Sequence, residues 1–134
     1  MRASTAGSAA RRRRRRRRIR YRRGRANLAL LYRLNGDENP LHADPQRAKA
    51  AGFERPILHG AASFGIAARA ILRECADYFP ERLKSIEARF SRPVFPGDTI
   101  RTEMWPQGER VAFQCRVVGR NDIVLSNGLA TLRR

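Results

Sequence analysis

The chain has 134 residues, two cysteines and a formal net charge of +17, which is enough sequence for one domain with one core. The charge is uneven, because residues 1–25 hold 13 basic and no acidic side chains, whereas the remainder holds 16 basic and 12 acidic ones. Overall basicity therefore describes an N-terminal arm and does not by itself make the rest a nucleic-acid-binding domain.

The arm, residues 1–26, contains eight consecutive arginines from Arg11 to Arg18. Such a segment cannot bury enough apolar surface to fold, so we expect it to be disordered. It could attach the chain to nucleic acid or to an anionic membrane through phosphate contacts. We favour the alternative that it is low-complexity sequence without a selected role, because no groove-reading element accompanies the charge.

A short helix is predicted over residues 27–34, followed by a loop from Gly36 to His42. The loop cannot be ordinary helix, because Gly36 is permissive and Pro40 lacks an amide proton and restricts its predecessor. It holds Asp37 and His42 five positions apart, and such a pair can activate a water molecule and return its proton. The structural alternative is that Asp37 forms an Asx turn and His42 is a satisfied histidine.

Two helices are predicted next. Asp44 can cap a short helix that ends near Gly52, and the longest helical pattern begins at Gly60 and ends within residues 78–80. The N-terminus of that helix offers unpaired amides and a dipole that favour negative charge. His59 directly precedes it, and we interpret this histidine as structural, as a helix cap, or as a group that orients a neighbour.

The remainder alternates between apolar and polar residues with period two, which predicts strands with one packed face. In the last strand this pattern places Leu125 and Asn127 on the same face. One long helix followed by four antiparallel strands is an α+β layer architecture. The predicted strands are centred on residues 86–90, 100–104, 111–117 and 123–129.

Cys75 and Cys115 lack metal-like or redox-like spacing and lie in apolar patterns. We expect two buried free thiols in a reducing compartment. The apolar run at residues 28–32 is far shorter than the ~20 residues that span a bilayer. A soluble, cytoplasmic protein is expected, although an arginine-rich, acid-poor N-terminus is also compatible with organellar import.

Two strings carry a resemblance to a known family: YRLNGDENPLHADP at residues 32–45 and GFERPILHG at residues 52–60. Over residues 27–133 the chain resembles the (R)-specific enoyl-CoA hydratases, the hydratase 2 or MaoC-type proteins. It resembles most the C-terminal catalytic half of the two-hot-dog hydratase 2. This implies a hot-dog fold for residues 27–134, with an antiparallel sheet wrapped around a long central helix. It also implies that the first strand and a preceding hot-dog half are missing.

The resemblance implies reversible syn hydration of a trans-2-enoyl-CoA to the (3R)-3-hydroxyacyl-CoA in fatty-acid metabolism, without a metal or redox cofactor. By position, Asp37 and His42 would be the catalytic pair that holds one water. An acyl-CoA would be the substrate, and a second copy in a homodimer or a second hot-dog half would be the partner. The positions that the resemblance assigns to substrate binding are Glu38, Asn39, Pro40, Leu41, Gly60 and Phe90.

Two other functions stay open at this point. A hot-dog acyl-CoA thioesterase would use the same polarised carbonyl and activated water. A non-catalytic hot-dog remnant could instead bind nucleic acid through its arginine-rich arm.

Overall fold

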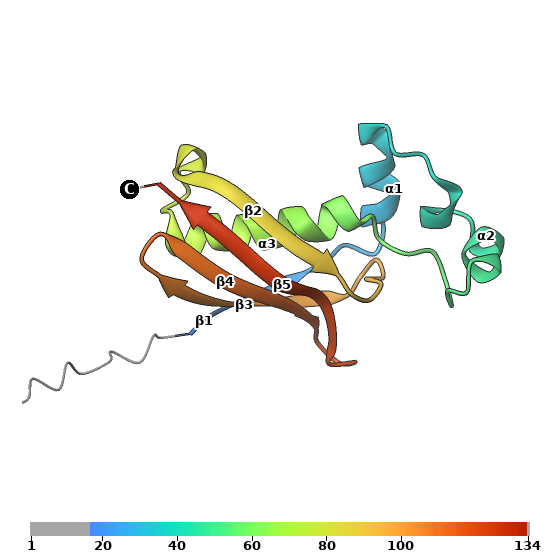
Figure 1. The fold of residues 1–134 in the computed structure, drawn as a ribbon. Helices are drawn as coiled ribbons and strands as arrows, with labels where there is room; N and C mark the ends of the chain where they lie inside the picture. Colours follow the sequence, from blue (N-terminus) through green and yellow to red (C-terminus); the bar gives the residue numbers. More distant parts are fainter. Residues whose placement is uncertain (1–16, 134) are drawn as a thin grey trace, which may run out of the picture.

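A five-stranded antiparallel sheet and one long helix dominate residues 17–133, the part of the chain that this computed structural model describes (Figure 1). The strand order is β1-β3-β4-β5-β2, so β1 and β2 form the two edges. The α+β prediction and its four strand segments are confirmed. The strands are β1 (Arg18–Arg23), β2 (Leu83–Phe90), β3 (Thr99–Gln107), β4 (Arg110–Val117) and β5 (Asp122–Leu132).

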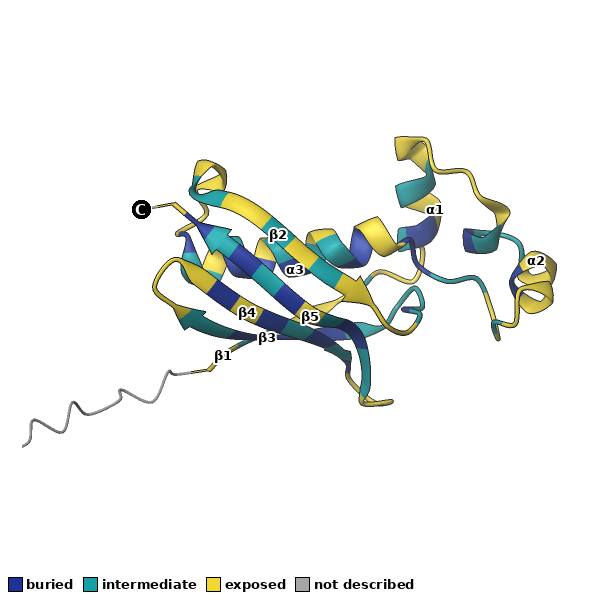
Figure 2. Ribbon diagram, viewed as in Figure 1, coloured by how far each residue is buried: buried dark blue, intermediate teal, exposed yellow. Residues whose placement is uncertain are grey.

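Helix α3 (Gly60–Cys75) lies along the face that the curved sheet encloses (Figure 1). The core forms there, because β3 and β4 pair residues that are apolar or small and buried, such as Met104 opposite Phe113. Fully burying a side chain of this size contributes about 1.5–3 kcal/mol. Figure 2 shows buried, half-buried and exposed residues along α3. Small residues such as Ala67 form most of its buried face, and Ile71 is its one large buried side chain.

The long helix ends earlier than predicted, at Cys75. Asp77 and Tyr78 have positive φ angles of 51° and 61°, which an α-helix cannot continue through. Cys75 is consequently half-buried at the helix end, and the prediction of two buried thiols holds only for Cys115. Burial raises the pKa of the Cys115 thiol to about 11.

Strand β1 corrects two expectations. Residues 18–23 are not disordered, and the sheet does not lack its first strand, because β1 pairs with β3 from Arg18 opposite Met104 to Arg23 opposite Thr99. Strand pairing uses backbone groups, which arginine supplies as well as any other non-proline residue. Charged side chains also suit an edge strand, since they oppose further edge-to-edge pairing. Residues 1–16 of the predicted arm lie outside the described residues.

Strand β5 departs from simple alternation. Phe113 pairs with Gly128 while Cys115 pairs with Leu125, so β5 has an extra residue between the two pairs. This β-bulge includes Asn127, whose φ is 50°. Within this bulge Asn127 is exposed, and it does not share the buried face with Leu125 as predicted.

The segment between β1 and α3 forms a group of short helices beyond one end of the sheet, beside the start of α3 (Figure 1). The Asp44 side chain accepts hydrogen bonds from the amides of Gln46 and Arg47, which confirms the predicted cap. Within residues 17–133 no helix has the length and apolar character needed to cross a bilayer. The short helices are α1 (Leu28–Tyr32), η1 (Arg33–Asn35), η2 (Pro40–His42) and α2 (Pro45–Ala50), and η3 (Pro80–Arg82) precedes β2.

The Glu103 carboxyl is expected to make the stability of the fold depend on pH in the acidic range. Its side chain is 3% exposed and pairs with Arg101 and with the Gln114 amide. Burial acts to raise the pKa of the Glu103 carboxyl, but the hydrogen bonds from Gln114 and Arg101 outweigh it and leave that pKa below its ordinary value. A carboxyl with a lowered folded-state pKa stabilises the fold above its unfolded-state pKa, and this contribution is lost as pH falls through the folded-state value.

We therefore expect Glu103→Gln to make the free energy of unfolding less dependent on pH below the ordinary carboxyl value of 4.5. Urea unfolding at a series of acidic pH values measures this. Glu87→Gln, at an exposed position of β2, is the matched control and should keep the dependence of the parent chain. The prediction would be contradicted if the free energy of unfolding fell equally with pH for Glu103→Gln and the parent.

Candidate active site

The loop that carries Asp37 is shaped by local hydrogen bonds. Gly36 has a φ of 102°, a left-handed conformation that suits glycine, and turns the chain out of η1. The Asp37 carboxylate accepts a hydrogen bond from the Asn39 amide at 3.3 Å. The Asn39 side chain in turn accepts from the Leu41 amide at 3.0 Å and begins η2. The Asx-type turn of the structural alternative is therefore present, and it fixes the carboxylate without burying it.

His42 is held by a backbone carbonyl. Its ring is 8% exposed, and Nδ1 donates to the Ile57 carbonyl oxygen at 2.8 Å. A carbonyl oxygen can only accept, so Nδ1 carries the proton and Nε2 of the neutral ring is left with its lone pair. Ile57 could not be recognised from the sequence as a site residue, because the contact uses its backbone and not its side chain.

His59 supports both members of the pair. It does not cap α3, contrary to one of its predicted roles. Its Nε2 donates instead to the backbone carbonyl of Asp37 at 3.1 Å, and its ring stacks on that of His42 with centroids 3.7 Å apart. The Tyr32 ring lies 4.8 Å from the His59 ring on centroids. His59, only 1% exposed, therefore orients the two residues that the sequence predicts to be catalytic.

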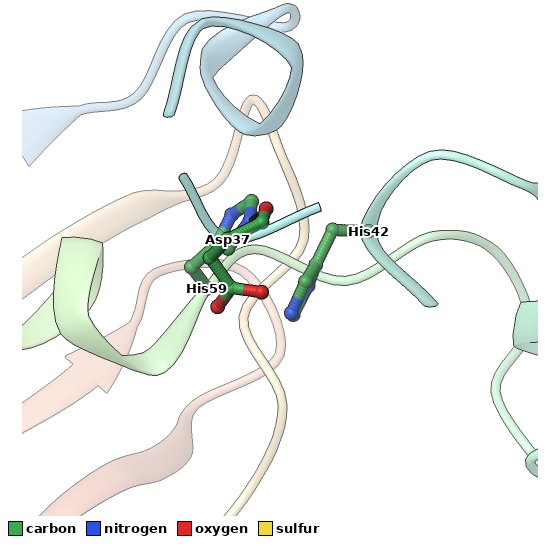
Figure 3. Close-up of side chains that lie close together, drawn as sticks. All are labelled: Asp37, His42 and His59. Atoms are coloured by element: carbon green, nitrogen blue, oxygen red, sulfur yellow. Dashed lines mark hydrogen bonds between the residues drawn. The ribbon is translucent and has the colours of Figure 1, made fainter. Parts of the chain in front are cut away.

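Asp37, His42 and His59 converge on one point (Figure 3). A carboxylate oxygen and one nitrogen from each ring all lie within 4.8 Å of one another. This spacing suits a bridging water molecule, and by distance alone it could also admit a metal ion. The absence of a metal or other cofactor from the reaction stays a prediction.

The start of α3 supplies donors beside this cluster. Among the described residues, the amides of Gly60 and Ala61 have no backbone carbonyl partner, as expected for the first turn of a helix. The absence of a side chain at Gly60 matters, because a Cβ there would lie 3.0 Å from Phe90 Cε1. Glycine at position 60 therefore lets the Phe90 ring pack against the start of α3, beside these amides.

A cavity of about 370 Å³ opens at the same place, with His42, Gly60 and Phe90 in its wall. Gly60 and Phe90 therefore share a cavity wall with His42, whereas Asp37 is not among the residues that line it. The predicted contact of Gly60 and Phe90 with substrate stays a prediction. The cavity also has an apolar wall that the sequence did not assign to the site. That wall includes Phe53, Ile57, Leu58, Val94 and Leu125.

The segment between Asp37 and His42 does not line this cavity. Glu38, Asn39 and Pro40 are exposed and Leu41 is half-buried, and none of these four lines the cavity. Asn39 instead shapes the loop, as described above. Their predicted contact with substrate remains a prediction.

The sequence profile of the MaoC like domain matches residues 5–127. The chain belongs to the MaoC-like domain family. It is 52% identical over 106 residues to the peroxisomal multifunctional enzyme type 2 of Mus musculus, covering 79% of this chain and 14% of that protein. It is 53% identical over 98 residues to the peroxisomal enoyl-CoA hydratase 2 of Arabidopsis thaliana, covering 73% of this chain and 32% of that protein.

The fold of this MaoC-like domain is also found in a solved relative. The structure of full-length peroxisomal multifunctional enzyme type 2 from Drosophila melanogaster matches with a TM-score of 0.85 and 43% identity, covering 87% of this chain and 22% of that one. The predicted hot-dog fold and the resemblance to hydratase 2 are thereby confirmed. The chain spans less than a third of the length of each of these relatives.

Proposed function

We propose that this MaoC-like domain catalyses the reversible syn hydration of a trans-2-enoyl-CoA to a (3R)-3-hydroxyacyl-CoA. The observation that carries the proposal is the convergence of the Asp37 carboxylate and the His42 ring beside the unpaired amides at the start of α3. Hydration needs both parts: a pair that handles the protons of water, and donors that stabilise the thioester oxygen.

In the proposed reaction, Asp37 and His42 hold one water molecule. The water oxygen bonds to C3 as one of its O–H bonds breaks, and a proton is delivered to C2 on the same face while the C2=C3 double bond is consumed. No net proton is gained or lost, so the pair ends in the protonation state in which it began. The negative charge that develops on the thioester oxygen faces the amides of Gly60 and Ala61 and the positive end of the α3 dipole.

The acyl chain is assigned to the apolar cavity of about 370 Å³. Phe90 lines this cavity at the end of edge strand β2 and is 57% exposed. A wall formed by an exposed aromatic ring is incomplete, and β2 has a free edge. We therefore infer that a second copy of the chain, or a second hot-dog half, completes the site.

The compartment also stays a prediction. The sequence suggests the cytoplasm, whereas the two relatives above carry peroxisomal names. Imaging the chain as a fluorescent fusion beside a peroxisomal marker decides between these locations.

The proposed function predicts that the protein, incubated with crotonyl-CoA, consumes the conjugated enoyl absorbance and forms the (3R) product. Sedimentation of the same sample establishes which assembly is active. Release of free thiol without loss of the double bond would favour the thioesterase alternative. Folded protein that changes neither signal as a dimer would contradict both enzyme readings.

A test of the nucleic-acid alternative needs a deletion that is shorter than the predicted arm of residues 1–26. Removing residues 1–25 would also remove β1 and would disturb the sheet. A chain that lacks only residues 1–16 keeps β1 intact. Salt-sensitive DNA binding that is lost with this deletion would support a binding role for the arm.

A further inference from the structure

A second and larger cavity, of about 620 Å³, lies between β1, α1 and α3. Gly60 lines the smaller cavity and the next residue, Ala61, lines this one. Tyr32 also lines the larger cavity and contacts the His59 ring. The smaller cavity therefore includes His42 in its wall, and the larger one approaches the cluster through Tyr32 and the start of α3.

The larger cavity, which we call the arginine cavity, is strongly basic. Six arginines line it and no carboxylate does. Two of the six, Arg20 and Arg73, share a single acidic partner, Glu74. Within residues 17–133, the other four have no carboxylate oxygen within 4.0 Å. The six are Arg20, Arg22, Arg23, Arg25, Arg69 and Arg73.

The sequence of β1 explains why this space is not filled by apolar packing. Arg20 is paired with Thr102 and Arg22 with Ile100, two buried residues on the face of β3 that packs towards α3. Alternate residues of a strand share a face, so β1 presents arginines where the neighbouring strand presents core residues. Charged heads are not buried without partners, and the gap between β1 and α3 therefore stays open.

Helix α3 presents a complementary stripe to the same cavity. Ala61, Gly65, Arg69 and Arg73 follow one another at intervals of four and are all exposed. A Cβ at Gly65 would meet nothing within 4 Å, which shows how open the first two turns are. The two small residues of the stripe therefore leave open space near the start of α3, and its two arginines place positive charge further along the helix.

The pKa of the nearby Tyr78 phenol is affected by the same positive charges. A hydrogen bond from Arg69, together with the charges of Arg69 and Arg73, lowers its pKa below the ordinary value. Tyr78 lies in the wall of the arginine cavity. Guanidinium groups without carboxylate partners are well suited to bind phosphate.

We propose that the arginine cavity binds the phosphate groups of the CoA portion of the substrate. This inference rests on the proposed function for the identity of the ligand. At 1.5 Å per residue, Arg69 and Arg73 lie ~14 and ~20 Å along α3 from Gly60. An extended pantetheine arm spans a comparable length. A thioester at Gly60 therefore places the acyl chain in the apolar cavity and the phosphates among the arginines.

The test is calorimetric binding of CoA, of 3′-phosphoadenosine 5′-phosphate and of phosphate-free pantetheine to the full chain. We expect the two phosphorylated ligands to bind in a salt-sensitive manner and pantetheine to bind far more weakly. The double variant Arg69→Gln/Arg73→Gln should weaken CoA binding at least ~10-fold, because charge-assisted hydrogen bonds are lost. With crotonyl-CoA it should raise KM and leave kcat nearly unchanged.

Arg89→Gln/Arg110→Gln is the matched control, since it removes the same charge at two exposed positions outside the cavity. It should bind CoA like the parent chain. Equal affinity of the cavity and control variants for CoA would overturn the proposal. Tight pyrophosphate binding that CoA cannot displace would also overturn it, by showing a site for free polyphosphate. Charge-dependent CoA binding by a chain without hydratase activity would uphold the cavity assignment and refute the proposed function.

Discussion

Asp37→Asn is expected to reduce the rate of enoyl-CoA hydration by at least ~10²-fold and to leave the fold intact. Asparagine keeps an oxygen that can accept from the Asn39 amide, the bond that fixes the Asp37 side chain in the loop. It cannot take up or return a proton. Asp37 is exposed, so the substitution buries no unsatisfied group and should change the free energy of unfolding little.

The measurement is kcat with crotonyl-CoA, beside thermal unfolding of the same preparation. Glu54→Gln is the matched control, because it removes one negative charge from an exposed position that lines neither cavity. It should retain most of the activity. If Asp37→Asn and Glu54→Gln lost activity equally, the effect would be one of general electrostatics, and Asp37 would have no specific role in proton transfer.

Gly128→Ala is expected to destabilise the fold by at least ~2 kcal/mol. A Cβ at Gly128 would lie 2.6 Å from the Phe113 carbonyl oxygen and 2.7 Å from its ring carbons Cδ1 and Cδ2. The carbonyl belongs to the paired backbone of β4, so it cannot move aside as a flexible side chain would. Strands β4 and β5 would have to separate, or the bulge would have to change its register.

Urea unfolding of the purified variant measures this effect. Gly65→Ala provides the contrast, because a Cβ there meets nothing within 4 Å and alanine is the better helix former. It should gain about 0.5–1 kcal/mol of stability. A Gly128→Ala chain as stable as the parent would show that the close packing of Phe113 against β5 is not required.

Glycine, proline and capping residues in the sequence were sufficient to predict the loop that holds Asp37 and His42. Gly36 and Pro40 exclude α-helix, and the loop contains only the short 3-10 helix η2, while Asp44 caps the α-helix that follows. Glycine and proline conformations and side-chain caps depend on neighbours within a few residues. The same holds for the start of α3 at Gly60. Period-two alternation was sufficient to predict the four strands, because alternate residues of a strand share a face, most clearly in β4, where every second residue is buried.

Tertiary structure decided the features that depend on partners distant in sequence. Residues 18–23 form a strand because β3 offers a free edge, which the composition of an arginine-rich segment cannot show. The bulge in β5 reflects the fit of Gly128 against Phe113 on another strand.

At the site, too, the residue types are visible in the sequence, whereas their contacts come from segments that are distant in the chain. The residues Asp37 and His42 could be read from the chain, whereas the proton position on His42 depends on the Ile57 carbonyl. Backbone groups carry no signature in the sequence, and His59 reaches the Asp37 carbonyl from 22 residues away. The sequence by itself therefore determined which groups could handle a proton, and the tertiary structure determined their orientation, because that depends on hydrogen bonds between segments that only folding brings together.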